Sequence, residues 1–456
     1  MNDFIALPLT APLQQAIAAA EYTAMTEVQA AALPAILAGR DVLGQAKTGS
    51  GKTAAFALGI LAALDASAVK LQGLVLCPTR ELADQVSKEI RKLARFIPNV
   101  KVLTLCGGVP LRPHLASLAH EPHIVVGTPG RILELIEHEA LPLAAIRVLV
   151  LDEADRMLDM GFADDIGAVA SKLPAKRQTL LFSATYPDEI RAISARFQRD
   201  PLAVTVASTL THDEVEQVFF EVDEARKPDA LAQLLCDRQP QSAVVFCNTR
   251  HDTRAVADDL SRRGFSVLAL HGELDQRERD EMLVRFANRS ASVLVATDVA
   301  ARGLDIVDLP MVVNYDMASD ADIHLHRIGR TGRAGAKGVA LSLCVPKEAP
   351  RANAIEAQQG APLHWGKLST AGGKGKPLVA AFTTLAIDGG RQDKVRPGDI
   401  LGALTGTAGL AADAVGKIDV FPTRCYVAIV RAQAENALNK LRAGKIKGRS
   451  FRVRKL

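Results

Sequence analysis

The segment that most constrains this chain consists of four apolar residues, Val148–Leu151, followed directly by Asp152-Glu153-Ala154-Asp155. A short, uninterrupted apolar run predicts a strand that is buried on both faces, as in parallel sheets. Such sheets bind ligands beyond the carboxyl ends of their strands, where carboxylates can hold a hydrated Mg²⁺ and orient a water molecule. The same segment could also be a strand followed by a charged helix start, with Asp152 as its N-cap.

Composition excludes several classes of protein. A chain of 456 residues is expected to form about two to four domains. No apolar run reaches the roughly 18 residues of a membrane span, and Met1–Phe4 lacks the features of a secretory signal. The six cysteines form no C-x-x-C pair, and most lie in or beside apolar runs, which indicates core residues in a reducing compartment. We therefore expect a cytoplasmic protein with no membrane contact, and a monomer by default.

Apolar runs alternate with helical segments through most of the chain, which is typical of parallel α/β domains. The pattern predicts a first domain over 1–206, a polar linker over 207–217, a second domain over 218–365, a flexible connector over 366–376 and a small third domain over 377–456. The expected strands are Gly73–Cys77, Val102–Leu105, Ile124–Gly127, Val148–Leu151 and Thr179–Ser183, then Ala243–Asn248, Val267–His271, Val293–Thr297, Met311–Tyr315 and Gly338–Cys344.

A glycine-rich stretch, Ala46–Thr53, indicates that the acidic residues belong to a site for a nucleotide phosphate. Glycines allow backbone N–H groups to turn toward phosphate oxygens, and a following helix N-terminus adds positive charge. Lys52 is expected to reach the outer phosphates, and Thr53 and Asp152 to ligate Mg²⁺, with Glu153 aligning the attacking water. A glycine-rich turn without a ligand is the alternative. The expected nucleotide contacts are Ala46, Lys47, Thr48, Gly49, Ser50, Gly51, Lys52 and Thr53.

A second cluster of charge lies in the second domain, where Arg327, Arg330 and Arg333 fall within seven residues beside His326. One arginine next to a γ-phosphate can raise the rate of hydrolysis by about 10³–10⁵. If these residues act on a nucleotide held by the first domain, ATP becomes a ligand for one interdomain geometry, and thus a mechanical switch. A surface salt-bridge network is the alternative.

These motifs, in this order, resemble the DEAD-box RNA helicases, a family named for its Asp-Glu-Ala-Asp tetrad. The resemblance extends from residue 4 to about residue 345. It implies two tandem RecA-like domains and an ATP-dependent RNA helicase that uses ATP and Mg²⁺. The matching segments are Ala46–Thr53, where Ala is the family's own first residue, Pro78–Ala83, Gly107-Gly108, Thr128–Arg131, Asp152–Asp155, Ser183–Thr185, Val244–Thr249, Ala296–Asp305 and His326–Arg333.

The resemblance also implies roles for single residues. A Gln amide can pair with N6 and N7 of adenine, so Gln29 would select ATP, with Phe4 stacking nearby. The family favours Gly and Pro at the positions held here by Glu21 and Glu27. Asp305 matches the position that approaches the ribose. The resemblance also implies catalytic roles for His326, Arg330 and Arg333, with the two arginines at the family's finger positions.

Further implied roles concern RNA. Ser183 and Thr185 match the element that links hydrolysis to strand separation. Hydroxyls, glycine N–H groups and arginines can contact phosphates and 2′-hydroxyls without reading sequence. The implied RNA-facing residues are Thr79, Arg80, Gly108, Thr128, Arg131, Thr249 and Thr297.

The last 80 residues are basic, with 14 Lys or Arg and 6 Asp or Glu, whereas the rest of the chain is slightly acidic. Near the C-terminus, Phe451, Val453 and Leu456 alternate with basic residues, which predicts a strand with one basic face beside a nucleic acid. A solvated tail is the alternative.

The last domain resembles the RNA-binding domain of a bacterial branch of the family that acts in assembly of the large ribosomal subunit. The resemblance is carried by Ala386–Gly390, Arg396–Asp399, Gly402–Gly406 and Gly444–Gly448. This implies an RRM-like α+β domain that binds a 23S rRNA hairpin near the peptidyl-transferase centre in pre-50S particles. Such domains stack bases on about two or three aromatic side chains. Because Ala386 occupies one such position, we expect recognition through charged edges and loops, by Arg396, Arg424, Tyr426, Lys445, Lys447, Arg449, Arg452 and Arg454.

The expected function is an RNA-dependent ATPase that locally unwinds or remodels 23S rRNA during 50S assembly. A general RNA-remodelling helicase, or an ATP-dependent RNA clamp without a dedicated rRNA target, is the nearest alternative. A DNA helicase on the same core is disfavoured by the RNA-type third domain. A pure rRNA scaffold would leave every motif before residue 377 without a role.

Overall fold

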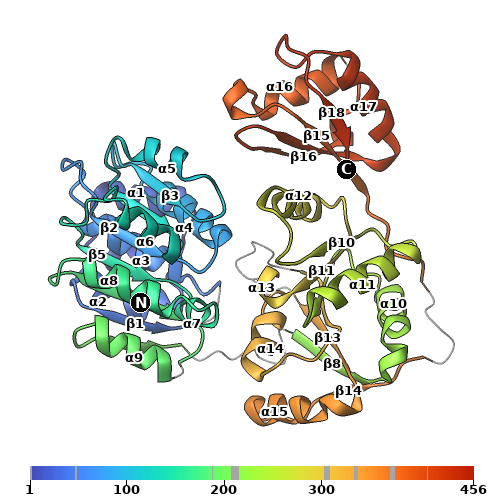
Figure 1. Cartoon of the computed structure of the whole chain (residues 1–456), viewed down its shortest axis with the longest axis horizontal. Coiled ribbons are helices and arrows are strands. Elements are labelled where there is room, and N and C mark those ends of the chain that lie inside the picture. The colour runs from blue at the N-terminus through green and yellow to red at the C-terminus, as the bar shows by residue number, and fades with distance from the viewer. Residues whose placement is uncertain are drawn as a thin grey trace. The chain divides into compact units, whose positions relative to one another are not determined.

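The computed structural model describes residues 3–46, 49–186, 188–206, 215–301, 309–332, 337–369, 375–407 and 409–456. These residues form two compact units, the first ending at 206 and the second beginning at 215 (Figure 1). The first unit is one parallel-sheet domain, domain 1. The second contains another parallel-sheet domain, domain 2, and a small antiparallel-sheet domain, the C-terminal domain, so the predicted fold class is confirmed. No helix in the described ranges is long and apolar enough to cross a membrane.

Domain 1 is built on a parallel sheet with the strand order β3-β4-β2-β5-β6-β1-β7. Its strands are β1 (Val42–Gln45), β2 (Gly73–Leu76), β3 (Val102–Leu105), β4 (Ile124–Gly127), β5 (Val148–Leu151), β6 (Gln178–Ser183) and β7 (Leu202–Thr205). Its helices are α1 (Ala11–Ala19), α2 (Glu27–Leu37), α3 (Lys52–Ala63), α4 (Arg80–Leu93), α5 (Leu111–Leu118), α6 (Pro129–Glu137), α7 (Ala154–Asp159), α8 (Ala163–Lys172) and α9 (Asp188–Phe197).

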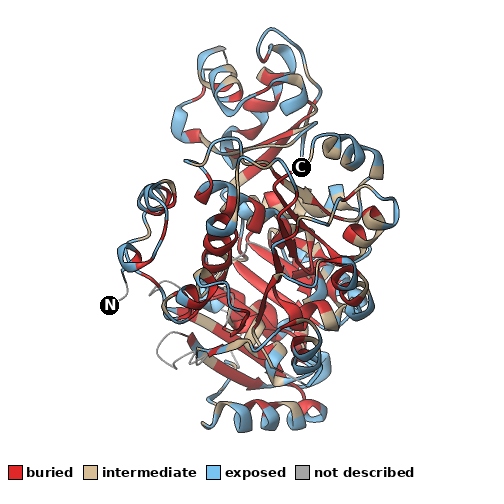
Figure 2. Cartoon of the chain, turned by 90° about the vertical axis from the view of Figure 1, so that its left-hand side faces the viewer, coloured by how far each residue is buried: buried red, intermediate tan, exposed pale blue. Residues whose placement is uncertain are grey.

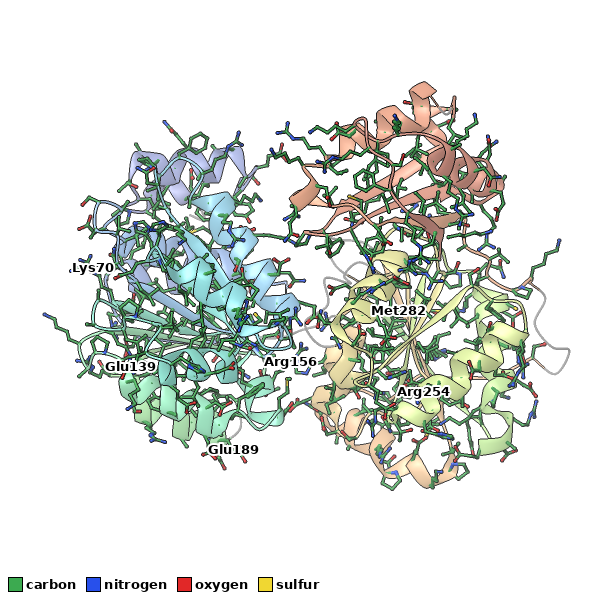
Figure 3. The ribbon with its side chains drawn as sticks, turned by 45° about the horizontal axis from the view of Figure 1, so that its top comes forward. Lys70, Glu139, Arg156, Glu189, Arg254 and Met282 are labelled. Carbon is green, nitrogen blue, oxygen red and sulfur yellow. The ribbon has the colours of Figure 1, made fainter. Side chains whose placement is uncertain are left out.

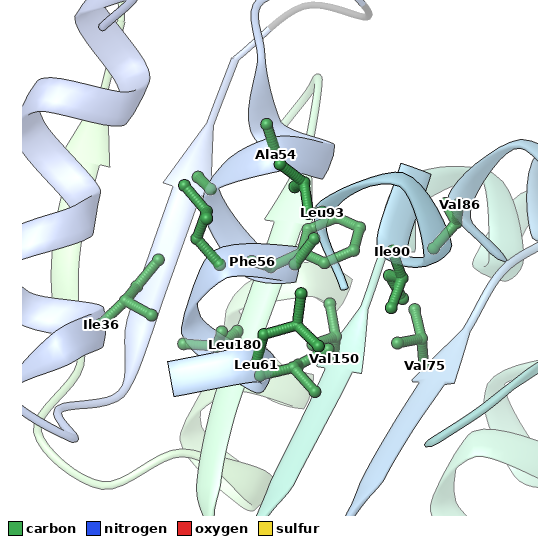
Figure 4. Packing of buried hydrophobic residues seen from close by; sticks show 14 of the residues in the cluster. Ile36, Ala54, Phe56, Leu61, Val75, Val86, Ile90, Leu93, Val150 and Leu180 are labelled. Atoms are coloured by element: carbon green, nitrogen blue, oxygen red, sulfur yellow. The ribbon is translucent and has the colours of Figure 1, made fainter. Parts of the chain in front are cut away.

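Helices cover both faces of this sheet, so successive strand residues enter opposite cores. Val75, Val150 and Leu180 pack with Phe56 of α3 on one face (Figure 4). Their neighbours, such as Leu149, pack on the other face against α6 and α8. A strand buried on both faces needs apolar residues at every position, which is why the uninterrupted runs predicted these strands correctly.

Domain 2 repeats this plan with the strand order β10-β11-β9-β12-β13-β8-β14. Its strands are β8 (Val215–Glu221), β9 (Ala243–Cys247), β10 (Val267–Leu270), β11 (Val293–Thr297), β12 (Met311–Asn314), β13 (Gly338–Cys344) and β14 (Trp365–Gly366). Its helices are α10 (Lys227–Arg238), α11 (Arg250–Arg262), α12 (Gln276–Ala287), α13 (Asp298–Ala301), α14 (Ala321–Ile328) and α15 (Ala349–Gln359). Strand β8 begins inside the segment expected as a linker, because Val215 and Val218 are buried in domain 2.

The C-terminal domain has an antiparallel sheet with the order β16-β17-β15-β18. Its strands are β15 (Phe382–Ile387), β16 (Val415–Val420), β17 (Cys425–Val430) and β18 (Val453–Lys455), and its helices are α16 (Pro397–Gly402) and α17 (Ala434–Ala443). Leu385, Val427 and Val453 face a core shared with α17. The predicted alternating strand near the C-terminus is therefore present as β18, with Val453 buried. In all three domains buried residues concentrate in the strands (Figure 2).

Candidate functional site

The glycine-rich stretch lies between the carboxyl end of β1 and α3. Gly51 is the N-cap of α3 with a φ of 94°. A Cβ at this position would lie 2.5 Å from Gln29 Nε2 and 2.8 Å from Thr26 Oγ1, so only glycine fits. The backbone N–H of Ala46 donates to the Ser183 carbonyl at 3.0 Å, which ties the loop to β6. Two expected contacts, Lys47 and Thr48, lie outside the described residues.

The side chains of this loop have the chemistry of a phosphate site. Lys52 is buried, and its Nζ donates to the Ala46 carbonyl oxygen at 2.5 Å. The hydroxyl oxygens of Ser50 and Ser183 are buried and have no hydrogen-bond partner. Leaving such groups unpaired costs free energy, so a ligand rich in acceptor oxygens would be stabilised here. These features fit the triphosphate of ATP.

The acidic tetrad begins at the carboxyl end of β5. Asp152 is buried, which raises the pKa of its carboxyl to about 7, with Glu153 adding to the shift and Lys52 opposing it. The Asp152 carboxylate accepts the backbone N–H of Glu153 at 3.0 Å. Helix α7 has Glu153, not Asp152, at its N-cap position, so the alternative role of Asp152 as a helix cap is not what the structure shows.

Glu153 is held by a residue that the sequence did not single out. Its φ is 51°, a left-handed conformation that a non-glycine residue adopts only with support from its surroundings. Arg156, labelled in Figure 3, forms a buried ion pair with Glu153, with Nη1 and Oε2 at 2.9 Å. The spacing of three residues at a helix start was the available signal. Arg156 therefore positions the residue expected to align the attacking water.

Asp155 connects the tetrad to the Ser183–Thr185 segment. Its Oδ2 accepts the backbone N–H groups of Ala184 at 3.1 Å and Thr185 at 2.9 Å, and the Thr185 hydroxyl at 3.0 Å. One carboxylate oxygen thus joins the end of β5 to the end of β6. The coupling role of Ser183 and Thr185 stays a prediction, and this contact gives it a physical route.

Gln29 lies beside the phosphate loop. Its Nε2 donates to the Gly51 carbonyl at 3.1 Å, and its Oε1 accepts the Thr26 backbone N–H at 2.9 Å in a capping box. Phe4 is buried and stacks on Tyr22, with ring centroids 6.3 Å apart. Both residues expected to contact adenine therefore lie on the domain that carries the phosphate loop.

The structure explains the family's preferences at two positions near Gln29. Glu21 has a φ of 61°, in the left-handed region that favours glycine, and Glu27 is the first residue of α2, where proline fits. We expect Glu21→Gly to stabilise domain 1 by up to about 1 kcal/mol, because relief of roughly 1–2 kcal/mol of backbone strain is partly offset by greater freedom of the unfolded chain.

Thermal unfolding of the full chain measures this change. The matched control is Glu27→Gly, which places glycine in a helix and should destabilise. A fall in unfolding temperature for Glu21→Gly would contradict the strain assignment.

The RNA-facing candidates of domain 1 gather at the carboxyl ends of β2, β3 and β4. A Cβ at Gly108 would lie 2.7 Å from Arg80 Nη1, so the loops after β2 and β3 touch. That Nη1 is buried and has no hydrogen-bond partner, as expected of a group that would bind a phosphate.

The other candidates of domain 1 have partners in the same loops. Thr128 Oγ1 accepts the Gly107 N–H at 3.2 Å, and Arg131 donates to the Val109 carbonyl at 2.7 Å. Thr79 caps α4 through its hydroxyl.

The domain 2 candidates occupy the equivalent ends of their own sheet. Thr249 caps α11 and Thr297 ends β11. Arg330 is buried in the turn after α14, and His326 is half-buried in the last turn of that helix. Asp305 and Arg333 lie outside the described residues.

Arg327, the first arginine of the cluster, is committed to the fold. Its guanidinium makes a bidentate pair with Asp298 at 2.7 Å and also donates to Asn248 Oδ1 at 2.8 Å and to the Asp316 carbonyl at 2.7 Å. These partners follow β11, β9 and β12, so Arg327 fixes three strand ends relative to α14. It is a structural residue, which leaves Arg330 as the described candidate for contact with phosphate.

In the C-terminal domain, the sheet face that would stack bases is covered. Tyr426 is only 2% exposed, and it packs with Ala386 against Val284 of α12. Thr384 Oγ1 accepts from Asn288 Nδ2 at 2.9 Å in the same contact. The sheet therefore packs on domain 2 where a standard RRM would bind RNA.

Two other candidates on this face also have partners. Arg454 pairs with Glu281 of α12 at 2.6 Å, and Arg424 pairs with Asp388 at 3.1 Å. The roles of Tyr426, Arg424 and Arg454 in RNA binding stay predictions. As the structure stands, these side chains hold the domain together or in place.

The remaining basic candidates form an exposed patch, which we call the two-loop basic surface, from residues 391–396 and 445–452. Lys447 Nζ donates to the Lys394 carbonyl at 3.0 Å, and Arg449 lies 3.8 Å from Asp393, so the two loops are neighbours. Lys447 and Gly448 both have positive φ, 52° and 77°, in a tight turn closed by Ile446 and Arg449. Its exposed cations are Arg391, Lys394, Arg396, Lys445, Lys447, Arg449 and Arg452. The sequence missed Arg391 and Lys394, which only the fold brings here.

Two parallel-sheet domains that carry a phosphate loop and an acidic tetrad are the parts expected of an ATP-dependent RNA helicase. The family models agree: residues 26–193 match DEAD/DEAH box helicase, 226–335 match the helicase conserved C-terminal domain, and 384–455 match the DbpA RNA binding domain. The chain belongs to the DEAD-box RNA helicases, hydrolases that act on ATP. It is 57% identical over 435 residues to the ATP-dependent RNA helicase DbpA of Escherichia coli, covering 95% of each chain.

Other relatives match the helicase core. The DEAD-box ATP-dependent RNA helicase CshA of Bacillus cereus is 43% identical over 357 residues, which cover 78% of this chain and 68% of that one. Among solved structures, S. cerevisiae Dbp5 bound to RNA and ADP BeF3 superposes with a TM-score of 0.75 at 31% identity, covering 81% of this chain and 96% of that one. The RecA-like class of both parallel-sheet domains follows from these matches.

Proposed function

We propose that this helicase remodels 23S rRNA in the cytoplasm during assembly of the large ribosomal subunit, with its C-terminal domain binding a hairpin near the peptidyl-transferase centre. The similarity to DbpA over nearly the whole chain, including the RNA-binding domain, supports the assignment. The single observation that carries it is the two-loop basic surface. It stays exposed while the sheet face is covered by domain 2, so the C-terminal domain keeps one surface suited to binding RNA.

In the ATP site, Thr53 and Asp152 are the residues that would hold Mg²⁺, since hard cations prefer oxygen ligands. Mg²⁺ would neutralise charge on the β- and γ-phosphates. Lys52 would turn from the Ala46 carbonyl to the phosphates. Glu153, oriented by Arg156, would accept a hydrogen bond from the attacking water.

Reversing charge on the two-loop basic surface tests the rRNA target. We expect Lys447→Glu with Arg449→Glu to raise the concentration of a 23S rRNA fragment needed for half-maximal ATPase stimulation by about 10- to 100-fold, because phosphate contacts dominate affinity. Both side chains are exposed, so folding should be unaffected. An RNA of equal length but unrelated sequence should stimulate the variant and the original chain equally.

The matched control is Lys417→Glu, an exposed charge reversal in β16 outside this surface. If the unrelated RNA stimulates the original chain as well as the rRNA fragment does, the chain is a general RNA-remodelling helicase and the proposed target is wrong. If the double variant keeps full preference for the rRNA fragment, the surface that recognises the rRNA lies elsewhere in the domain.

A further inference from the structure

Domain 1 carries a basic pocket at the edge of its sheet opposite the ATP site. Strands β5, β6, β1 and β7 are neighbours in the sheet, and the segments leading into all four line a pocket of about 650 Å³. Each segment contributes positive charge. The basic lining residues are Arg147 before β5, Lys176 and Arg177 before β6, Arg40 before β1 and Arg199 before β7.

The carboxylates in the pocket do not balance this charge. Asp41 is buried and is used by the fold, since its two carboxylate oxygens each accept a backbone N–H at 2.7 Å, from Thr179 and Arg199. Asp200 is exposed and lies 4.0 Å from Arg40, a distance and exposure at which an ion pair contributes little. Five cations against two carboxylates leave an excess of three positive charges.

The hydrogen bonds of the arginines also indicate that the positive charge of the pocket is not balanced. Arg147 donates to the Ala63 carbonyl at 3.2 Å and Arg177 to the Pro174 carbonyl at 2.9 Å, so neutral groups serve as their acceptors. Arg177 Nε is buried and has no hydrogen-bond partner. Burial lowers the pKa of Arg177, and the nearby positive charge of Arg199 lowers it further while Asp41 opposes the shift. A polyanion would relieve this mutual repulsion.

The chemistry of the lining residues limits the class of ligand that the pocket can bind. Besides the charged residues it contains Gly39 and Gln178, and the described lining has no aromatic or aliphatic side chain on which a base could stack. The pocket therefore suits phosphate groups and not nucleobases. It is separate from the ATP site, because strands of four residues at about 3.3 Å each place the two sheet edges more than about 10 Å apart.

We propose that this pocket binds the phosphate backbone of RNA outside the helicase track, as a second and sequence-independent contact of domain 1. Four of its five cations are exposed and arranged along an open edge, which suits an extended phosphodiester chain. Free polyphosphate shares this chemistry. RNA is favoured because the pocket lies on the domain whose loops we expect to face RNA. A longer RNA bound to those loops is already close to the pocket, so its effective concentration there is high and the second contact adds affinity.

The test uses the full chain with Arg147→Glu and Lys176→Glu combined. Two RNAs are compared by equilibrium binding: a short single strand that fills only the helicase track, and a longer, unrelated RNA with a duplex and a single-stranded extension. We expect the affinity for the long RNA to fall by about tenfold or more. The salt dependence of its binding should become shallower, by an amount that corresponds to the loss of about two phosphate contacts. Affinity for the short strand and the ATPase rate that it stimulates should not change.

The matched control is Lys88→Glu with Arg95→Glu, two exposed charge reversals of domain 1 outside the pocket. Equal affinity of the pocket variant and the original chain for the long RNA would overturn the proposal, as would an equal loss for both RNAs. Tripolyphosphate binding is measured separately. If the variant loses tripolyphosphate binding but keeps full affinity for the long RNA, the pocket is a small-anion site, and the RNA proposal is wrong.

Discussion

Lys52→Ala is expected to lower RNA-stimulated ATP hydrolysis by at least about 10²–10³-fold, the loss typical of removing one preorganised donor from a site of developing charge. The Lys52 ammonium is buried at the N-terminus of α3 and has a loop carbonyl as its hydrogen-bond acceptor. It is therefore desolvated before ATP arrives, which strengthens its attraction to the phosphates. Steady-state phosphate release at saturating RNA and ATP measures the effect.

Because Lys52 is buried, a loss of folding has to be separated from a loss of chemistry. Lys52→Met keeps most of the length and nearly all of the volume of the side chain without its charge, and it should be as inactive as Lys52→Ala while unfolding at nearly the original temperature. Lys70→Ala, an exposed lysine of the same domain (Figure 3), is the matched control and should be fully active. Turnover by Lys52→Met close to that of the original chain would refute the phosphate-loop assignment.

Arg330→Ala is expected to slow hydrolysis by about 10³-fold or more, in the range known for arginines that stabilise charge on a transferring phosphate. RNA binding should change little, because the described residues of domain 2 that we expect to face RNA are Thr249 and Thr297, at other strand ends. Single-turnover hydrolysis with RNA in excess isolates the chemical step from product release.

Arg330 is buried, so the conservative variant Arg330→Lys accompanies the alanine variant. Lysine keeps the charge but loses the planar fork, so an intermediate rate is expected. Arg262→Ala, an exposed arginine of α11, is the control and should leave the rate unchanged. A loss smaller than about tenfold in a folded Arg330→Ala variant would argue against direct contact with the phosphate.

The sequence predicted strands well where burial dictates composition. Leu149 and Val150 face opposite cores, so neither position tolerates a polar residue. Strand β1 escaped this criterion because it contains Gly44 and Gln45. Gly44 is needed there because a Cβ would lie 2.5 Å from the Phe182 ring. Packing on the adjacent strand, and not periodicity, explains that residue.

The sequence predicted least well where distant segments meet. Tyr426 has the same local pattern whether its face binds RNA or packs on Val284, because the partner lies more than 140 residues away in the chain. The basic pocket of domain 1 combines residues as far apart as Arg40 and Arg199. Each is an ordinary surface charge in its own segment, and only the parallel sheet order places them together.

The covered sheet face of the C-terminal domain determines how that domain can present RNA to the motor. A domain on a free tether samples a large volume, and the length of the tether sets its effective concentration. Here Tyr426, Thr384 and Arg454 hold the C-terminal domain on α12, within one compact unit. If RNA binds the two-loop basic surface as proposed, its distance from the strand ends of domain 2 is a property of the fold. The contact with α12, and not the length of a tether, would then set how far that RNA lies from domain 2.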